Sequence, residues 1–157
     1  MSLLKIDGEW KIVSKSFYAK LLDEVEKVNF KSADKEKPAI EATLKNYLKG
    51  QATGNPEFLR QAFYKDARII AFRGNKISNL SSEEFAGFFK SKIADDEAKR
   101  NRWIESLDIS GNAATAKIIL DYPTIKFNDY MSLLKIDGEW KIVNKSFYAE
   151  PKQPKQK

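Results

Sequence analysis

The sequence contains no cysteine and no histidine among its 157 residues. Without cysteine, the chain forms no disulfide, holds no metal through thiolates and has no cysteine nucleophile. Without histidine, it lacks the side chain most often used as a general base and as a metal ligand near neutral pH. These absences exclude serine–histidine–aspartate triads, the usual zinc sites and histidine-based redox sites.

Long apolar runs are also missing, because no stretch approaches the roughly 18–20 apolar residues of a transmembrane helix. There is no glycine-rich phosphate loop. The acidic cluster at 95–97 lacks the alternating spacing and the glycine of a calcium loop. We therefore predict no membrane association, no metal and no cofactor. The chain opens directly into a β-pattern and not into a signal peptide, which leaves the compartment open.

Charge of one sign is not concentrated anywhere in the chain. The 28 basic and 22 acidic residues leave a formal net charge of +6. Residues 150–157, which we interpret as a disordered basic tail, hold three lysines and one glutamate. A nucleic-acid-binding domain typically gathers its basic residues in one patch or stripe. We therefore predict no nucleic-acid partner.

The chain does contain enough apolar material for one globular domain. Hydrophobic residues make up 42% and aromatic residues 12% of the sequence. A chain of this length buries roughly 68–70% of its unfolded surface, so it needs no disulfide to hold a core.

An internal duplication is the most informative feature. Residues 1–19 read MSLLKIDGEWKIVSKSFYA, and residues 131–149 repeat them at eighteen of nineteen positions, with Ser14 in the first copy and Asn144 in the second. Such identity indicates a recent duplication or a deliberate rearrangement. In each copy an Asp-Gly pair separates two apolar runs, which is a strong signal for a β-hairpin with a type I′ turn.

The two copies are candidates for one place in the fold. Only the second has a long lead-in, residues 125–130, so we expect it to occupy the main sheet. The first copy then competes for that place, extends an exposed edge, swaps into a neighbouring chain or remains an unused extension. Residues 21–30 predict a short helix and residues 31–37 a polar linker. The whole segment 20–37 is long enough for the first copy to reach the same sheet.

Residues 38–149 predict an α+β domain. We expect one helix over 38–52, with Pro38 in its first turn, and a second from Asn55 onward. A third begins at the capping box of Ser81 and Glu84 and presents an apolar face of Phe85, Phe88, Phe89 and Ile93. Strands are expected over 66–72, 102–109, 113–121, 125–136 and 139–148. This order favours about three helices packed on one face of a curved antiparallel sheet.

Five short strings stand in a recognisable order: YLKG at 47–50, FYKDA at 63–67, LSSEEF at 80–85, DYMSLL at 129–134 and DGEWKIVNK at 137–145. With the order of elements, they make residues 38–149 resemble the cone-shaped, cystatin-like fold of nuclear transport factor 2 and its SnoaL-like relatives. Within that superfamily the strings are most similar to the branch called putative lumazine-binding proteins.

The resemblance implies a small-molecule pocket and a homodimer formed through the sheet, and relatives are often exported. It assigns no reaction, because the superfamily includes isomerases, dehydratases, hydrolases, cyclases and non-enzymatic binders. The sequence departs from the branch at Asn55, where Asp is common, and at Tyr64 and Tyr148, where His is common. Histidine-dependent dehydratase or cyclase chemistry is therefore out of reach.

The hairpin over 125–148 predicts where a ligand sits. With a two-residue turn at 137–138, an unbroken register places Met131 opposite Asn144 and Asp129 opposite Ser146. One face of the hairpin then resembles the inside of a cone. Together with Tyr47, this face supplies the predicted pocket residues: Phe127, Met131, Trp140, Ile142, Asn144 and Ser146. The counterparts in the first copy are Trp10 and Ser14.

Asp129 is the candidate catalytic residue. A carboxylate on an otherwise apolar face has a raised pKa and can act as a general base. The structural alternative is a strand-end aspartate bonded to backbone or to a lysine.

The sequence leaves three functions open. The first, which we favour, is a SnoaL-like protein that binds a small apolar or aromatic molecule, without an assigned reaction. The second is a lyase- or isomerase-type enzyme that uses Asp129 as its base and a pocket tyrosine as hydrogen-bond donor. The third is an assembly or fold-switching protein in which residues 1–19 exchange with 131–149, as in a strand-exchanged homodimer.

Overall fold

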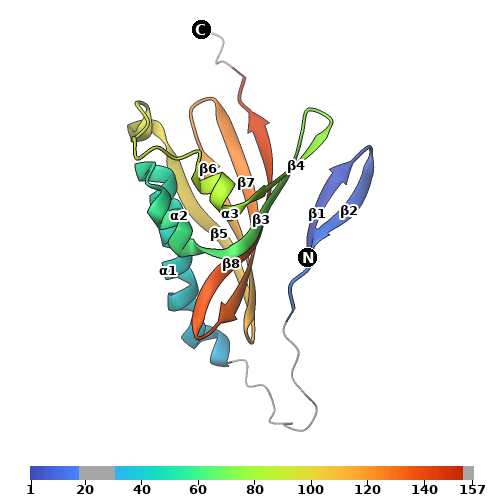
Figure 1. Ribbon diagram of the computed structural model, residues 1–157, viewed down its shortest axis with the longest axis vertical. Helices are drawn as coiled ribbons and strands as arrows, with labels where there is room; N and C mark the ends of the chain where they lie inside the picture. Colours follow the sequence, from blue (N-terminus) through green and yellow to red (C-terminus); the bar gives the residue numbers. More distant parts are fainter. Residues whose placement is uncertain (18–30, 154–157) are drawn as a thin grey trace.

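The computed structural model describes residues 1–17 and 31–153 (Figure 1). The elements in chain order are β1 (Ser2–Ile6), β2 (Glu9–Ser14), α1 (Lys31–Thr53), α2 (Pro56–Ala62), β3 (Phe63–Arg73), β4 (Lys76–Ser81), α3 (Ser82–Ala86), a 3₁₀ turn (Glu97–Lys99), β5 (Asn101–Ser110), β6 (Ala113–Asp121), β7 (Ile125–Ile136) and β8 (Glu139–Pro151). The helix predicted over 21–30 lies outside the described residues. No helix within the described ranges is long and apolar enough to cross a membrane.

A six-stranded sheet in the order β4-β3-β8-β7-β6-β5 forms one layer, and the three helices form the other (Figure 1). We call the face covered by helix α1 the inner face and the opposite one the outer face. The predicted α+β class is confirmed. The sheet is mixed, however, because β3 and β8 run parallel while the other pairs are antiparallel. These two neighbours are far apart in the chain, so no hairpin imposes the antiparallel direction.

Helix α1 is longer than the sequence predicted, because it begins at Lys31 and not at residue 38. The segment 31–37 is therefore helix and not linker, and Pro38 lies inside the helix. Tertiary contacts anchor this early part. Glu36 accepts hydrogen bonds of 2.7 Å from Lys135 Nζ and from Trp140 Nε1. These bonds hold the part of the helix that precedes Pro38, where the proline ring removes one backbone hydrogen bond.

The region around β4 also differs from the prediction. Strand β4 was not predicted, and it forms a hairpin with β3 around the left-handed residues Gly74 and Asn75. The capping box of Ser81 and Glu84 is confirmed, but the helix that it opens ends at Ala86. The apolar face predicted for a longer helix is accordingly split. Phe85 and Phe89 pack against the core, whereas Phe88 and Ile93 are exposed.

The second copy of the duplicated hairpin occupies the middle of the main sheet as β7 and β8, as expected. Asp137 and Gly138 both have positive φ, 50° and 86°, as a type I′ turn requires. Strand β8 runs on to Pro151, so the predicted disordered tail is ordered as far as Lys152. That residue pairs with Asp121 at 2.6 Å, and residues 154–157 lie outside the described part.

The register of β7 and β8 contains a β-bulge that the sequence did not predict. Leu133 pairs with Ile142, but the next pair is Ser132 with Asn144, so Val143 is an extra residue on β8. From that point on, the predicted register is wrong by one residue. The bulge turns Lys145 to the inner face and Asn144 to the outer face.

The first copy forms a separate two-stranded sheet, β1–β2, that contacts β3, β7 and β8 (Figure 1). Its turn has the same positive φ values at Asp7 and Gly8. It also has the same bulge, because Leu3 pairs with Ile12 and Ser2 with Ser14. Residues of this hairpin and of the main sheet together line a cavity of about 790 Å³.

Candidate functional site

Three polar side chains from three elements meet at the inner face of the sheet: Tyr47 of α1, Asp129 of β7 and Lys145 of β8. The Tyr47 hydroxyl donates to Asp129 Oδ2 at 2.6 Å. Lys145 Nζ donates to the Tyr47 oxygen at 2.7 Å and lies 3.0 Å from Asp129 Oδ2. We call these three residues the inner cluster.

The inner cluster is almost sealed from solvent. Tyr47 and Asp129 have no exposed surface, and Lys145 is 3% exposed. Burial raises the pKa of Tyr47 well above its usual value, and the neighbouring Asp129 charge raises it further. Burial lowers the pKa of Lys145, and the attraction of Asp129 opposes that effect. The phenol therefore stays protonated at neutral pH, while the amine is easier to deprotonate than an ordinary lysine.

One oxygen of the inner cluster has no partner. Asp129 Oδ2 receives both hydrogen bonds, whereas Oδ1 is buried and has no hydrogen-bond partner among the residues that the structure describes. The carboxylate is held in place by one oxygen while the other remains free to accept a proton or a hydrogen bond.

A chain of hydrogen bonds connects the inner cluster to the 3₁₀ turn before β5. Gln51 Nε2 donates to the Tyr47 oxygen at 3.1 Å, and the Tyr122 hydroxyl lies 3.4 Å from Gln51 Oε1. Arg102 Nε donates to the Tyr122 oxygen at 3.1 Å, and its guanidinium also pairs with Glu97 at 2.7 Å. The Arg102 side chain is only 8% exposed. Polar groups thus continue from the loop before β5 to the centre of the core.

Aromatic rings surround the amine of the inner cluster. Lys145 Nζ lies 5.0 Å from the ring centres of Tyr47 and Phe85 and 4.9 Å from that of Phe147. At these distances the rings attract a cation. The site therefore combines an amine, a phenol and a carboxylate with apolar walls, which suits an organic molecule with one polar end.

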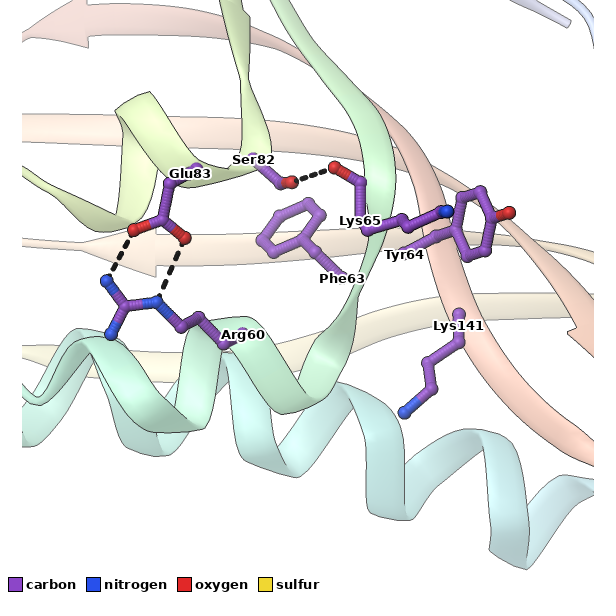
Figure 2. A pocket seen from close by; sticks show the side chains of 7 residues that line it. All are labelled: Arg60, Phe63, Tyr64, Lys65, Ser82, Glu83 and Lys141. Atoms are coloured by element: carbon purple, nitrogen blue, oxygen red, sulfur yellow. Dashed lines mark hydrogen bonds and ion pairs between the residues drawn. The ribbon is translucent and has the colours of Figure 1, made fainter.

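A cavity of about 490 Å³ lies next to these walls (Figure 2). It is lined by Arg60, Phe63, Tyr64, Lys65, Ser82, Glu83 and Lys141. Its Arg60–Glu83 ion pair closes one side, as the dashed lines in Figure 2 show. Phe63 packs edge-on against both Tyr47 and Phe85, with ring centres 6.0 and 5.9 Å away. Phe63 therefore links the wall of the cavity to the surroundings of the inner cluster.

The structure distributes the sequence-predicted pocket residues over both faces. Asp129 and Tyr47 bond to each other, and Phe127 lies on the same face. Three further predicted residues on the inner side are packed into the hydrophobic core: Met131, Trp140 and Ile142. Asn144 and Ser146 lie on the outer face, because the bulge at Val143 reverses their side.

The sequence analysis missed Lys145, because an unbroken register points its side chain outward. The residues singled out in the first copy are not part of the site. Trp10 is 67% exposed, and Ser14 pairs with Ser2 in the separate hairpin. Among the described residues, no group of three or more acidic side chains is arranged to hold a metal ion.

The curved sheet, the covering helices and the polar cluster between them define an NTF2-like pocket protein. A crystal structure of an NTF2-like protein of unknown function from Shewanella baltica is 26% identical, with a TM-score of 0.69 over 76% of this chain and 97% of that one. A cystatin-like domain of unknown function from Nostoc punctiforme has a TM-score of 0.57 over 74% of this chain and 78% of that one, at 15% identity, and supports the fold alone.

The family is shown by a match of residues 35–148 to the family described as "Putative lumazine-binding". The chain belongs to this family, which associates it with small-ligand binding. A relative from a Cladobotryum species, named aldolase FrzH, is 25% identical over 127 residues, which cover 74% of this chain and 94% of that protein. Family and fold support a pocket protein without assigning a reaction.

Proposed function

We propose that this protein binds a small, largely apolar or aromatic organic molecule beside the inner cluster, with a donor group of the ligand bonded to Asp129 Oδ1. The main support for this proposal is the Oδ1 atom, which is buried and has no hydrogen-bond partner among the described residues. A buried acceptor without a partner costs roughly 1–3 kcal/mol, and a ligand N–H or O–H removes this cost.

The apolar character of the proposed ligand follows from the walls. Phe63, Phe85 and Phe147 surround the cluster, and aromatic surface binds flat apolar groups well. The cavity in Figure 2 adjoins Phe63, so a rotation of this ring is the proposed route by which a ligand reaches Asp129. The family description makes lumazine, an aromatic bicycle with ring N–H donors, the first probe.

The test combines native mass spectrometry of gently purified protein with ligand-observed NMR of lumazine. We expect either a retained small molecule or broadened lumazine signals with the unmodified protein. In Asp129→Asn, the amide oxygen can accept the bonds from Tyr47 and Lys145. The amide NH₂ group, a donor, then stands where Oδ1 offered an acceptor. Donor ligands should therefore lose about tenfold or more in affinity.

The matched control is Ser146→Ala, which changes another buried, unpartnered oxygen on the outer face. This variant should bind like the unmodified protein. Equal binding by Asp129→Asn, or a bare chain mass together with unperturbed lumazine spectra, would overturn the proposal.

We propose a second role for the first hairpin, namely exchange into the main sheet of a second copy of this chain. Leu3, Trp10 and Ile12 are 46%, 67% and 61% exposed. Their counterparts in β7 and β8 are at most 3% exposed and form part of the core. Because the two copies are nearly identical, the surface proposed to receive the first copy is the one that now holds the second.

Sedimentation at several concentrations tests this exchange. Trp10→Glu should abolish a dimer without destabilising the monomer, because Trp10 is exposed in the fold described here and must be buried on exchange. Glu9→Gln is the control, since both Glu9 and its counterpart Glu139 are exposed. A monomer at all concentrations, or a dimer that survives Trp10→Glu, contradicts the exchange.

A further inference from the structure

We propose that Lys145 is an amine nucleophile that condenses with a small aldehyde or ketone to form an imine inside the cone. The inference rests on the proposed function, since it assigns a chemistry to the same site. The geometry that supports it is the contact of one amine with both a phenol and a carboxylate, each within 3.0 Å.

The first requirement for such a nucleophile is a neutral amine. Burial disfavours the ammonium form of Lys145, and Asp129 Oδ2 lies 3.0 Å away to take the proton. Because Oδ1 of the same carboxyl group is unpartnered, Asp129 can hold this proton and still face the bound carbonyl compound.

The proposed step balances within the inner cluster. Lys145 gives one proton to Asp129, and its nitrogen lone pair forms a C–N bond with the carbonyl carbon as the C–O π pair moves to oxygen. The oxygen takes a second proton from the nitrogen, which yields a carbinolamine. Asp129 returns its proton to the departing hydroxyl, the C–O bond breaks, and water leaves. The product is a protonated imine that faces the Asp129 carboxylate.

The other groups of the site have matching roles. The Tyr47 hydroxyl keeps its proton and fixes Asp129 Oδ2 at 2.6 Å, while Gln51 donates to Tyr47 at 3.1 Å. Both are therefore positioning residues. Phe85 is partly exposed and lies in the five-residue helix α3, so one of the three rings that cover the amine belongs to a short element.

A surface next to this cover suits a polar substituent on the carbonyl compound. Lys65 and Lys141 line the cavity in Figure 2 together with Phe63, whose ring also contacts Tyr47 of the inner cluster. Pyruvate, which carries a carboxylate beside its carbonyl, and acetaldehyde, which carries no charge, are therefore two informative probes. A preference for pyruvate would assign the lysines to substrate binding.

The duplication supplies an internal control for the nucleophile. Lys15 is the counterpart of Lys145 and is followed by the same residues, Ser-Phe-Tyr-Ala, but it is exposed and lies directly after β2. Peptides that contain the two lysines differ in mass because Ser14 precedes one and Asn144 the other. One sample therefore reports both reactions under identical conditions.

In the experiment, the full chain is incubated at pH 7 with each probe separately and sodium cyanoborohydride, which reduces any imine to a stable secondary amine. Adducts on the two lysines are then quantified by mass spectrometry of peptides. With at least one probe, we expect the modification rate of Lys145 to exceed that of Lys15 by a factor of about ten or more. The reason is that the site holds the carbonyl next to a neutral amine. In 8 M urea, roughly the limit of denaturant strength, the ratio should fall to about one since only the fold distinguishes the lysines.

The result that overturns the proposal is a Lys145 that reacts no faster than Lys15 with either probe, which is what a purely structural buried ion pair produces. A second readout is the pH profile, where the rate at Lys145 should level off at a lower pH than the rate at Lys15. If adducts are absent but lumazine still binds in an Asp129-dependent way, the nucleophile is wrong and the binding function stands.

Discussion

Replacement of Asp129 by asparagine gives the sharpest test of the inner cluster. The variant keeps the shape of the side chain and an oxygen for the Tyr47 hydroxyl, but it removes the only carboxylate that pairs with Lys145 in the described structure. Lys145 then either remains charged without a counterion or folds as a neutral amine. Removing one partner of a buried pair typically costs about 3–5 kcal/mol.

The neutral form sets an upper limit on the cost. An ordinary lysine amine has a pKa of 10.5. Removing its proton costs about 1.4 kcal/mol for each unit by which the pH lies below that pKa. The limit is therefore about 5 kcal/mol at pH 7 and about 2 kcal/mol at pH 9. The sign follows from proton binding: burial lowers the pKa of Lys145 in the folded state, so the unfolded chain binds the extra proton and stability rises with pH.

The assay is urea unfolding of the unmodified protein and Asp129→Asn at pH 7, 8 and 9. We expect the difference in unfolding free energy to shrink as the pH rises, because loss of Asp129 lowers the pKa of Lys145 further. Ser146→Ala should show a small difference that does not change with pH. A constant difference between the two proteins across this range would refute the idea that Asp129 controls the protonation of Lys145. If the variant is unfolded at pH 7, the series at higher pH still gives the slope.

Two further predictions use matched positions in the two copies, and a third concerns a close backbone contact. Deletion of Val143 should lower the melting temperature strongly by turning Lys145 out of the core, whereas deletion of Val13 should leave the main transition in a circular-dichroism melt unchanged; equal effects would contradict the role of the bulge. Trp140→Phe should lower the free energy of unfolding by about 1.5–3 kcal/mol, because it removes the indole hydrogen bond to Glu36. Trp10→Phe should leave the stability almost unchanged. It should also remove the tryptophan emission that acrylamide quenches most readily. Gly54→Ala should destabilise by more than about 1 kcal/mol, since Gly54 has φ of +67° and a Cβ there would lie 2.2 Å from a backbone oxygen; an unchanged denaturation midpoint would contradict this.

Local signals in the sequence predicted much of the fold. The Asp137-Gly138 turn, the Asn55 cap and the Ser81–Glu84 capping box all form as their residue types indicate. Each of these features depends on contacts within a few residues, so the pattern alone carries the information. Asp129 was also placed on the inner face, because the strand before the bulge alternates without interruption.

Features that depend on distant partners were harder to predict. The first turns of α1 look like a polar linker, and their helical form is anchored by the bonds of Glu36 to Lys135 and Trp140, 99 and 104 residues away in the chain. Strand β4 has weak β-character and is held by its pairing with β3. In the candidate site, a single extra residue at Val143 exchanged the sides of Asn144 and Lys145 and so changed the chemistry of the predicted pocket.

The duplicated hairpin separates local from tertiary causes within one molecule. Both copies have the same turn and the same bulge, although one lies in the core of a six-stranded sheet and the other in a separate pair of strands. The geometry of the turn and of the bulge is therefore encoded in the residues that the two copies share. Burial is not, since Ile142 is fully buried and Ile12 is 61% exposed.

The same comparison explains why the chemistry of Lys145 cannot be a property of its own sequence. Lys15 has the same residues after it, but the groups that pair with Lys145 come from α1 and from the part of β7 that precedes the duplicated segment. A lysine becomes a candidate nucleophile here only when the bulge turns it inward and Tyr47 and Asp129 receive it. A transplant of residues 131–149 alone should accordingly reproduce the hairpin without the reactivity, and the two lysines of this chain already make that comparison possible.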